Sequence, residues 1–331
     1  GFPGTEELIG IGVVMTLFPI FFAVIENDLR KVLCYSLNNQ LGFMVVGIGI
    51  GTELALNGAV AHAFVHILYK ALLFMSMGAV LYRTGTIRAS DLGGLYRSMP
   101  WTTAFCIVGA MSISAFPLFS GFVAKSLTMS AVVEGYYVLA FVGLLIASAG
   151  VMEHSGIKIP YFAFFGHDSG IRCREAPFHM CLAMGATAVL CIGIGWFPAP
   201  LYAILPYPVL YQPYADLGHS LTQLQLLLFA ALAFAVLLRT GLYPPEQATI
   251  NLDTDWLYRR LAPRVLRFAT ARVVSVRHNL GEAARQVGRS VMRAVLRHYG
   301  PEGTLARTWP TGSMVLWVTV LLAASLILYY V

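Results

Sequence analysis

The fold is decided by one apolar stretch, residues 56–82, which reads LNGAVAHAFVHILYKALLFMSMGAVLY. It is long enough to cross a hydrocarbon core of about 30 Å as an α-helix. His62, His66 and Lys70 recur every four residues in it, so on a helix they share one face and span about 12 Å along the axis. The stretch therefore predicts a membrane-spanning helix with ionisable groups in its interior.

The composition of the whole chain is that of an integral membrane protein. Of 331 residues, 58% are hydrophobic and 11% are charged, whereas a soluble domain carries about 25% charged residues. The net charge of +6 does not indicate nucleic acid, because the basic residues lie between apolar runs and form no soluble basic face. The five cysteines contain no C-x-x-C pair, so no disulfide framework or metal site is predicted, and no cofactor is expected.

Apolar runs and the residues that interrupt them predict an all-α polytopic membrane protein with about eight transmembrane helices, one of them broken. The predicted helices cover residues 7–25, 32–50, 56–82, 101–133 (the broken one), 137–155, 179–197, 221–238 and 313–330.

Basic residues are concentrated in alternate loops. The loops after the first, third, fifth and seventh helices hold 20 of the 22 lysines and arginines, and the opposite loops hold none. Lys158, Arg172 and Arg174 fall in the loop after the fifth helix. The positive-inside rule then predicts that the basic loops face the cytoplasm. We expect the membrane to be the inner membrane of a prokaryote.

The polar face of residues 62–70 suits proton transfer. A charged lysine at the bilayer centre costs at least about 2.5–3.5 kcal/mol, so Lys70 is expected to face the bundle interior or a hydrated cavity. Loss of solvation favours its neutral amine, which would let it exchange protons near neutral pH. An imidazole can accept a proton on one nitrogen and release one from the other, so His62 and His66 would extend the relay. A satisfied pair of core histidines and a zinc site on the same pair are the alternatives.

The fourth predicted helix contains SISAFPLFSGFVAK at residues 112–125. Pro117 removes a backbone donor and Gly121 follows closely, so the helix is expected to break in mid-membrane. Unpaired backbone groups at that depth are tolerated only inside protein or beside a wet cavity, and broken helices mark ion sites in transporters. Lys125 lies beside the break and is the second candidate for proton transfer, unless the helix is merely kinked and the lysine snorkels.

Two smaller polar clusters complete the candidate residues. Asp28, with Arg30 and Lys31, could cap the second helix or lie at the mouth of the proton path. Glu153 and His154, at the predicted end of the fifth helix, could be an exit pair or an interfacial anchor.

The long polar stretch, residues 240–312, carries a basic stripe. Arg285, Arg289, Arg293 and Arg297 recur every four residues beside a row of valines, which predicts an amphipathic helix. The helix could lie at the cytoplasmic interface with anionic lipid near its arginines, or it could contact a specific partner.

Three of these motifs resemble the proton-translocating antiporter family, which comprises the D and A subunits of Mrp-type sodium/proton antiporters and the antiporter-like subunits of respiratory complex I. The motifs are DLRKVLCYS at residues 28–36, similar to the family's D-[IL]-K-R-x-L-A-Y-S; His62, His66 and Lys70 followed by ALLF; and Pro117, Gly121 and Lys125.

The resemblance implies a fold and roles for its residues. Residues 7–155 would be the second of two inverted five-helix repeats, with Lys70 and Lys125 as its central and outer proton-exchanging lysines. The first repeat would lie upstream, so the chain is expected to be truncated at its N-terminus. Residues 160–165 and 252–259 are more similar to the D-type subunits of Mrp antiporters than to complex I. The predicted domains are 1–155, the repeat; 156–240, two further transmembrane helices; 241–312, the basic cytoplasmic segment; and 313–331, the last transmembrane helix.

Three functions are compatible with the sequence. The first is a transporter subunit that passes protons in exchange for sodium. The second is a membrane-arm subunit of a complex I-like or hydrogenase-type redox complex, with the electron chemistry in its partners, because the chain has no cysteine cluster for iron and sulfur. The third is a non-conducting scaffold, against which the intact lysines and histidines argue. All three predict other membrane subunits as partners.

Overall fold

The computed structural model describes residues 5–215, 217–243, 246–248, 251, 256–308 and 310–330. The chain divides into two units, Gly1–Asn251 and Leu252–Val331. The described residues form helices and no strand, with one isolated bridge between Asp28 and Arg88. The predicted all-α class is confirmed, whereas residues 252–255 of the family-like stretch 252–259 lie outside the described residues.

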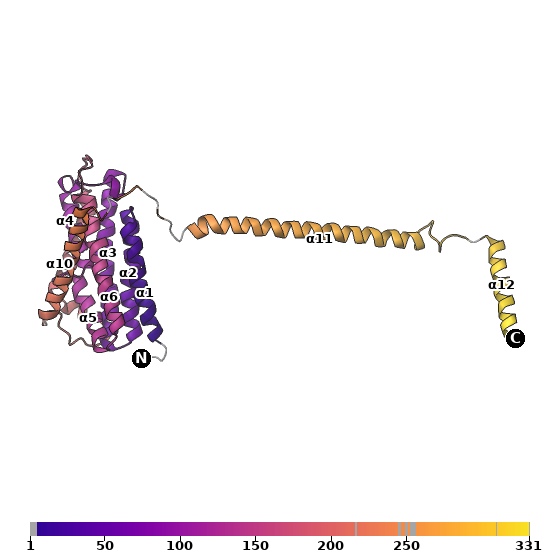
Figure 1. Ribbon diagram of the computed structural model, residues 1–331, viewed down its shortest axis with the longest axis horizontal. Coiled ribbons are helices and arrows are strands. Elements are labelled where there is room, and N and C mark those ends of the chain that lie inside the picture. The colour runs from indigo at the N-terminus through magenta and orange to yellow at the C-terminus, as the bar shows by residue number, and fades with distance from the viewer. Residues whose placement is uncertain are drawn as a thin grey trace. The chain divides into compact units, whose positions relative to one another are not determined.

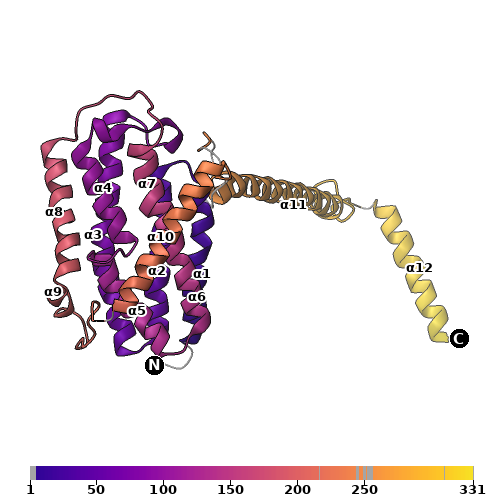
Figure 2. The ribbon, with the colours of Figure 1, turned by 60° about the vertical axis from the view of Figure 1, so that its left-hand side comes forward.

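The first unit is a bundle of helices that run side by side (Figures 1 and 2). Its longer helices are α1 (Glu6–Ile25), α2 (Leu29–Ile50), α3 (Glu53–Thr84), α4 (Pro100–Ile113), α5 (Ser120–Glu134), α6 (Val138–Val151), α8 (Phe178–Trp196) and α10 (Leu217–Thr240). Short elements lie between them: η1 (Ala89–Asp91), η2 (Leu95–Arg97), η3 (Met152–Ile157), α7 (Lys158–Pro160), η4 (Tyr161–Phe165) and α9 (Ala199–Tyr202).

Seven helical stretches of the described residues are long and apolar enough to cross a membrane, and Pro100–Ile113 is a shorter apolar helix. They correspond to the eight predicted helices, with α4 and α5 as the two halves of the broken one. The protein is therefore an integral membrane protein, as predicted.

The fifth membrane span is longer than predicted. The prediction ended it at residue 155, but the helical stretch runs from Val138 to Phe165. Beyond residue 155 the chain stays helical through the π-helical turn η3, the short helix α7 and the π-helical turn η4. Lys158 consequently lies inside a membrane span, and its assignment to a loop was wrong.

Helices α1 and α2 pack closely because glycines lie between them. A Cβ atom on Gly42 would lie 2.5 Å from the carbonyl oxygen of Gly12, and one on Gly12 would lie 2.7 Å from a Val46 methyl carbon. Small residues allow such backbone approach between membrane helices. Helix α3 packs against α2, α4, α5 and α8, so its polar face is enclosed by protein.

The second unit contains the π-helical turn η5 (Leu257–Leu261), α11 (Ala262–Tyr299) and α12 (Thr311–Tyr330). Helix α11 is one continuous helix of 38 residues without a buried side chain (Figure 1). Its arginine and valine rows have the amphipathic arrangement that the spacing predicted.

Candidate functional site

A row of polar side chains is buried inside the first unit. Its residues come from α2, α3, the two halves of the broken helix with the turn between them, and the fifth span. Its members are Ser36, Asn39, Gln40, His62, His66, Lys70, Ser112, Ser114, Ser120, Lys125, Ser126, His154, Ser155 and Lys158. Polar groups at this depth are rare unless they serve a function, so the row is the candidate site.

His62 lies in a hydrogen-bonded network between α3 and α2. Its Nε2 atom is 2.9 Å from the Tyr69 hydroxyl and 3.1 Å from Gln40 Oε1. The Tyr69 hydroxyl also donates to Gln40 Oε1, and Gln40 Nε2 donates to Asn39 Oδ1 at 2.7 Å. Asn39 in turn donates to the Thr16 carbonyl of α1. The network fixes His62 Nε2 and leaves Nδ1 available for a proton.

His66 and Lys70 continue the same face of α3. The rings of His62 and His66 have centroids 6.3 Å apart, and His66 lies edge-on to Tyr69 at 5.4 Å. Within the described part of the chain, His62 Nδ1, His66 Nε2 and Lys70 Nζ are buried without a hydrogen-bond partner. Such atoms are costly to bury unless they exchange protons or water, which matches a relay.

The broken helix is built around a tight turn at residues 114–119. Ala115 and Leu118 have positive φ angles of 57° and 73°, which residues other than glycine rarely adopt. The hydroxyls of Ser112 and Ser120 lie 2.7 Å apart across the turn and join the two halves. A Cβ atom on Gly121 would lie 1.8 Å from the Ser112 carbonyl oxygen, so only glycine fits there.

Lys125 forms a hydrogen bond at the C-terminal end of α4. Its Nζ atom donates to the Ile113 carbonyl at 2.9 Å and lies 5.1 Å from the centre of the Phe43 ring. The last carbonyls of a helix lack intrahelical donors and carry partial negative charge, so they stabilise a cation. The break thus places a lysine and its polar contact inside the bundle.

The fifth span adds polar groups from the other side of α2. His154 is fully buried, its Nδ1 atom lies 2.8 Å from the Ser155 hydroxyl, and Ser155 donates to Ser36 at 2.8 Å. Glu153, beside His154, is half-buried.

Lys158 is the most enclosed cation in the row. Its Nζ atom is 2.9 Å from Glu246 Oε1 and donates to the carbonyls of Val24 and Glu26 at 2.6 and 2.8 Å. It therefore ties the segment after α10 to the C-terminal end of α1.

The Asp28 cluster has a different geometry. Asp28 is the N-cap of α2, and its carboxylate accepts hydrogen bonds from the backbone N–H groups of Arg30 and Lys31 at 2.9 and 3.2 Å. The Arg30 side chain is exposed and the Lys31 side chain is half-buried.

Sequence reasoning missed several residues that the structure brings to the row. Tyr69 follows His62 by seven residues, and Gln40 follows Ser36 by four, so helical spacing could have identified both. Lys158 was predicted to lie in a loop because the predicted fifth helix ended at residue 155. Glu246 is remote in sequence and lies in a polar stretch.

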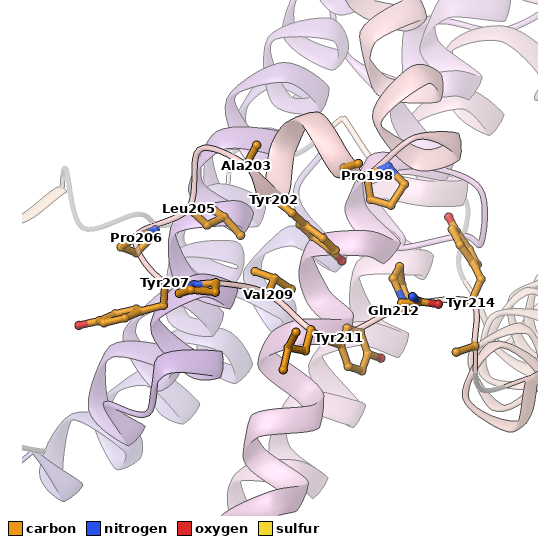
Figure 3. Close-up of a pocket in the computed structure, with 15 residues that line it drawn as sticks. Pro198, Tyr202, Ala203, Leu205, Pro206, Tyr207, Val209, Tyr211, Gln212 and Tyr214 are labelled. Atoms are coloured by element: carbon orange, nitrogen blue, oxygen red, sulfur yellow. The ribbon is translucent and has the colours of Figure 1, made fainter.

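A large cavity is lined by residues outside this row. It measures about 1000 Å³ and is formed by the loop Pro198–Ala215, whose tyrosines are shown in Figure 3. Asn57 holds the loop by exchanging two hydrogen bonds with the backbone of Tyr207. No lysine, histidine or carboxylate is among the described residues that line it, so it does not suit proton transfer.

Comparison with known proteins agrees with the motif resemblance. The family described as "NADH:quinone oxidoreductase/Mrp antiporter, TM" matches residues 5–151. Residues 5–151, less than half of the chain, are thus similar to this family. The matched range contains the three motifs that carry the resemblance, so the predicted resemblance to the family is confirmed.

Three known proteins illustrate the likeness. The chain is 36% identical to the D subunit of the Na(+)/H(+) antiporter of Alkalihalophilus pseudofirmus over 206 residues, which cover 61% of this chain and 41% of that protein. It is 34% identical to NADH-ubiquinone oxidoreductase chain 5 of Sus scrofa over 158 residues, which cover 47% and 25%. A chain of the membrane-bound sulfane sulfur reductase, an archaeal respiratory membrane complex, aligns with 99% of this chain and 56% of its own length, with a TM-score of 0.58 and 23% identity. The chain spans less than half of these two curated relatives, and the structural likeness shows a shared fold.

Proposed function

We propose that this chain is the proton-conducting membrane subunit of a cation/proton antiporter. Protons would pass between Lys70 and Lys125, with His62 and His66 as intermediate carriers. The observation that supports this most directly is a buried pair of lysines, one on α3 and one at a helix break, with a histidine network beside them. The sodium/proton antiporter among the relatives supports the same class, with Na⁺ as the exchanged cation.

A membrane-arm subunit of a redox-driven complex is the second candidate. It is favoured by the likeness to NADH-ubiquinone oxidoreductase chain 5 and to the respiratory membrane complex. The same lysines would move protons, and the driving energy would come from a partner enzyme. In both cases the partners would be other membrane subunits.

The finer assignments are also part of the proposal. The basic loops would face the cytoplasm of a prokaryotic cell, with the chain in the inner membrane. The segment 241–312 would lie against anionic lipid through its arginines. The division into residues 1–155, 156–240, 241–312 and 313–331 stays a prediction.

The test uses the full-length protein in its native membrane complex. Lys70→Ala and Lys125→Ala should each reduce the pH gradient formed by everted vesicles at least tenfold, while the protein remains inserted. Lys125→Arg should fail as well, because a guanidinium keeps its charge but does not release a proton. Arg239→Ala is the control, since it removes an exposed cation at the end of α10. Normal gradients in both alanine variants would reject the proposal.

A further inference from the structure

A small cavity lies between Lys125 and helix α10. It measures about 20 Å³ and is lined by residues of α2, α5, α6 and α10, among them Lys125, Ser126, His219 and Gln223. A cavity needs only about 10–15 Å³ and a few polar neighbours to hold one water. The space is therefore large and polar enough for a single bridging water.

His219 is held over this cavity by two contacts. Its Nε2 atom lies 3.1 Å from the Ser126 hydroxyl, directly after Lys125 in the chain, and its ring packs on Phe122 with centroids 5.5 Å apart. It lies in the first turn of α10, which begins at Leu217, and its side chain is half-buried. The imidazole thus lies beside the residue that follows Lys125, next to a cavity that Lys125 also lines, and it is half-buried.

Helix α10 makes a second polar contact with the same region. Gln223, one turn after His219, donates through Nε2 to the Ser114 carbonyl in the helix break at 3.4 Å. The helix also packs against α6 and η3. These contacts fix the register of α10, so the position of His219 beside Ser126 is determined by packing on several elements.

We infer that His219 is the proton-exchanging residue that connects Lys125 with the face of the bundle that carries the α5–α6 turn. This inference rests on the proposed function. Among the described residues that line the cavity, Lys125 and His219 are the two with basic side chains, and no carboxylate is present. In the outward direction, an N–H bond of the Lys125 ammonium breaks, a proton crosses the bridging water, and an N–H bond forms on the imidazole. The imidazolium then releases a proton to water at the surface, and Lys125 is left as a neutral amine.

A purely structural role would have a different signature. Ser126 and Phe122 could use His219 only to attach α10 to α5. A glutamine can keep the hydrogen bond to Ser126 but cannot carry a proton. The comparison of glutamine, alanine and added imidazole therefore separates proton transfer from attachment.

The experiment measures the rate of pH-gradient formation by the full-length protein in vesicles. His219→Gln and His219→Ala should each lower the rate about tenfold or more, and imidazole buffer should restore the His219→Ala rate several-fold. His179→Gln is the matched control, because His179 is an exposed histidine in the first turn of α8. It should retain the wild-type rate with and without imidazole.

The outcomes separate this inference from the proposed function. A wild-type rate in His219→Gln, or an impaired His219→Ala that imidazole does not restore, overturns the role of His219. Loss of activity in Lys125→Ala alongside a normal His219→Gln would reject the inference and leave the proposed function standing. Normal activity in both Lys70→Ala and Lys125→Ala would reject the proposed function itself.

Discussion

At the scale of single residues, the two central lysines have unlike surroundings. Lys125 donates to the Ile113 carbonyl and faces an aromatic ring, so its ammonium has partners. Lys70 Nζ has no hydrogen-bond partner within the described residues, although only 4% of the residue is exposed. Burial without a polar contact disfavours a charged ammonium, so the surroundings of Lys125 favour its charged form more than those of Lys70 do.

Gly121 offers a test of the broken helix. Gly121→Ala should destabilise the protein by about 2 kcal/mol, because its methyl group would overlap the Ser112 carbonyl oxygen and separate the two half-helices. The midpoint of thermal denaturation in detergent should fall accordingly. Gly78→Ala is the control, since nothing lies within 4 Å of a Cβ there, and alanine should stabilise helix α3 by about 0.5–1 kcal/mol. Equal midpoints for the two variants would contradict the geometry of the break.

At the scale of elements, the fifth span differs from its prediction, because it continues from residue 155 to Phe165. The π-helical turns η3 and η4 carry the chain past Gly156 and Pro160 and bring Lys158 under the end of α1. The buried ammonium is then satisfied by α1 carbonyls and by Glu246. One side chain therefore joins three separate segments.

The Lys158–Glu246 pair should contribute strongly to that attachment. Its side chains are only 1% and 7% exposed, and removing one partner of a buried pair typically costs about 3–5 kcal/mol. Lys158→Met and Glu246→Gln should each lower the midpoint of thermal denaturation. The decrease in the double variant should be smaller than the sum of the decreases in the two single variants.

The exposed pair Asp168–Arg172 provides the control for this measurement. A hydrogen bond from Arg172 holds the pKa of the Asp168 carboxyl well below its usual range, so the pair is charged at neutral pH. Both side chains are about half exposed, so solvent screens the attraction, and Asp168→Asn should leave the thermal midpoint unchanged. A larger effect there than at Lys158 would refute the importance of the buried pair.

At the scale of the whole molecule, the second unit is defined by its long basic helix. Every residue from Arg285 to Arg297 in α11 is exposed in the described structure, including the valines between the arginines. An amphipathic helix of this kind is suited to a membrane interface that contains anionic lipid.

Lipid retention by the full-length protein tests this arrangement. The protein should be extracted from membranes that contain phosphatidylglycerol and phosphatidylcholine, and it should retain the anionic phosphatidylglycerol preferentially. Each arginine near the surface contributes up to about 1 kcal/mol to the attraction for anionic lipid. Replacement of Arg285, Arg289, Arg293 and Arg297 by glutamine should reduce the phosphatidylglycerol bound, as quantified by mass spectrometry. High salt should have a similar effect, because ions screen exposed charges. Unchanged retention in the glutamine variant would rule out the arginine row as the lipid contact.

The sequence by itself determined the class, the eight apolar segments and the central polar face. These depend on local properties: hydrophobic length, the four-residue spacing of His62, His66 and Lys70, and the inability of Pro117 to continue a helix. The break at Pro117 was predictable for the same reason. Each of these features depends on residues that are close together in the chain.

Only the tertiary structure decided which groups meet. Gln40 meets His62, and Glu246 meets Lys158, because segments from separate parts of the sequence pack together. The continuation of the fifth span past residue 155 was also not predicted, and it brings Lys158 to the end of α1 and to Glu246. Hydrogen bonds and ion pairs across the bundle act between segments far apart in the chain, and no local pattern specifies them.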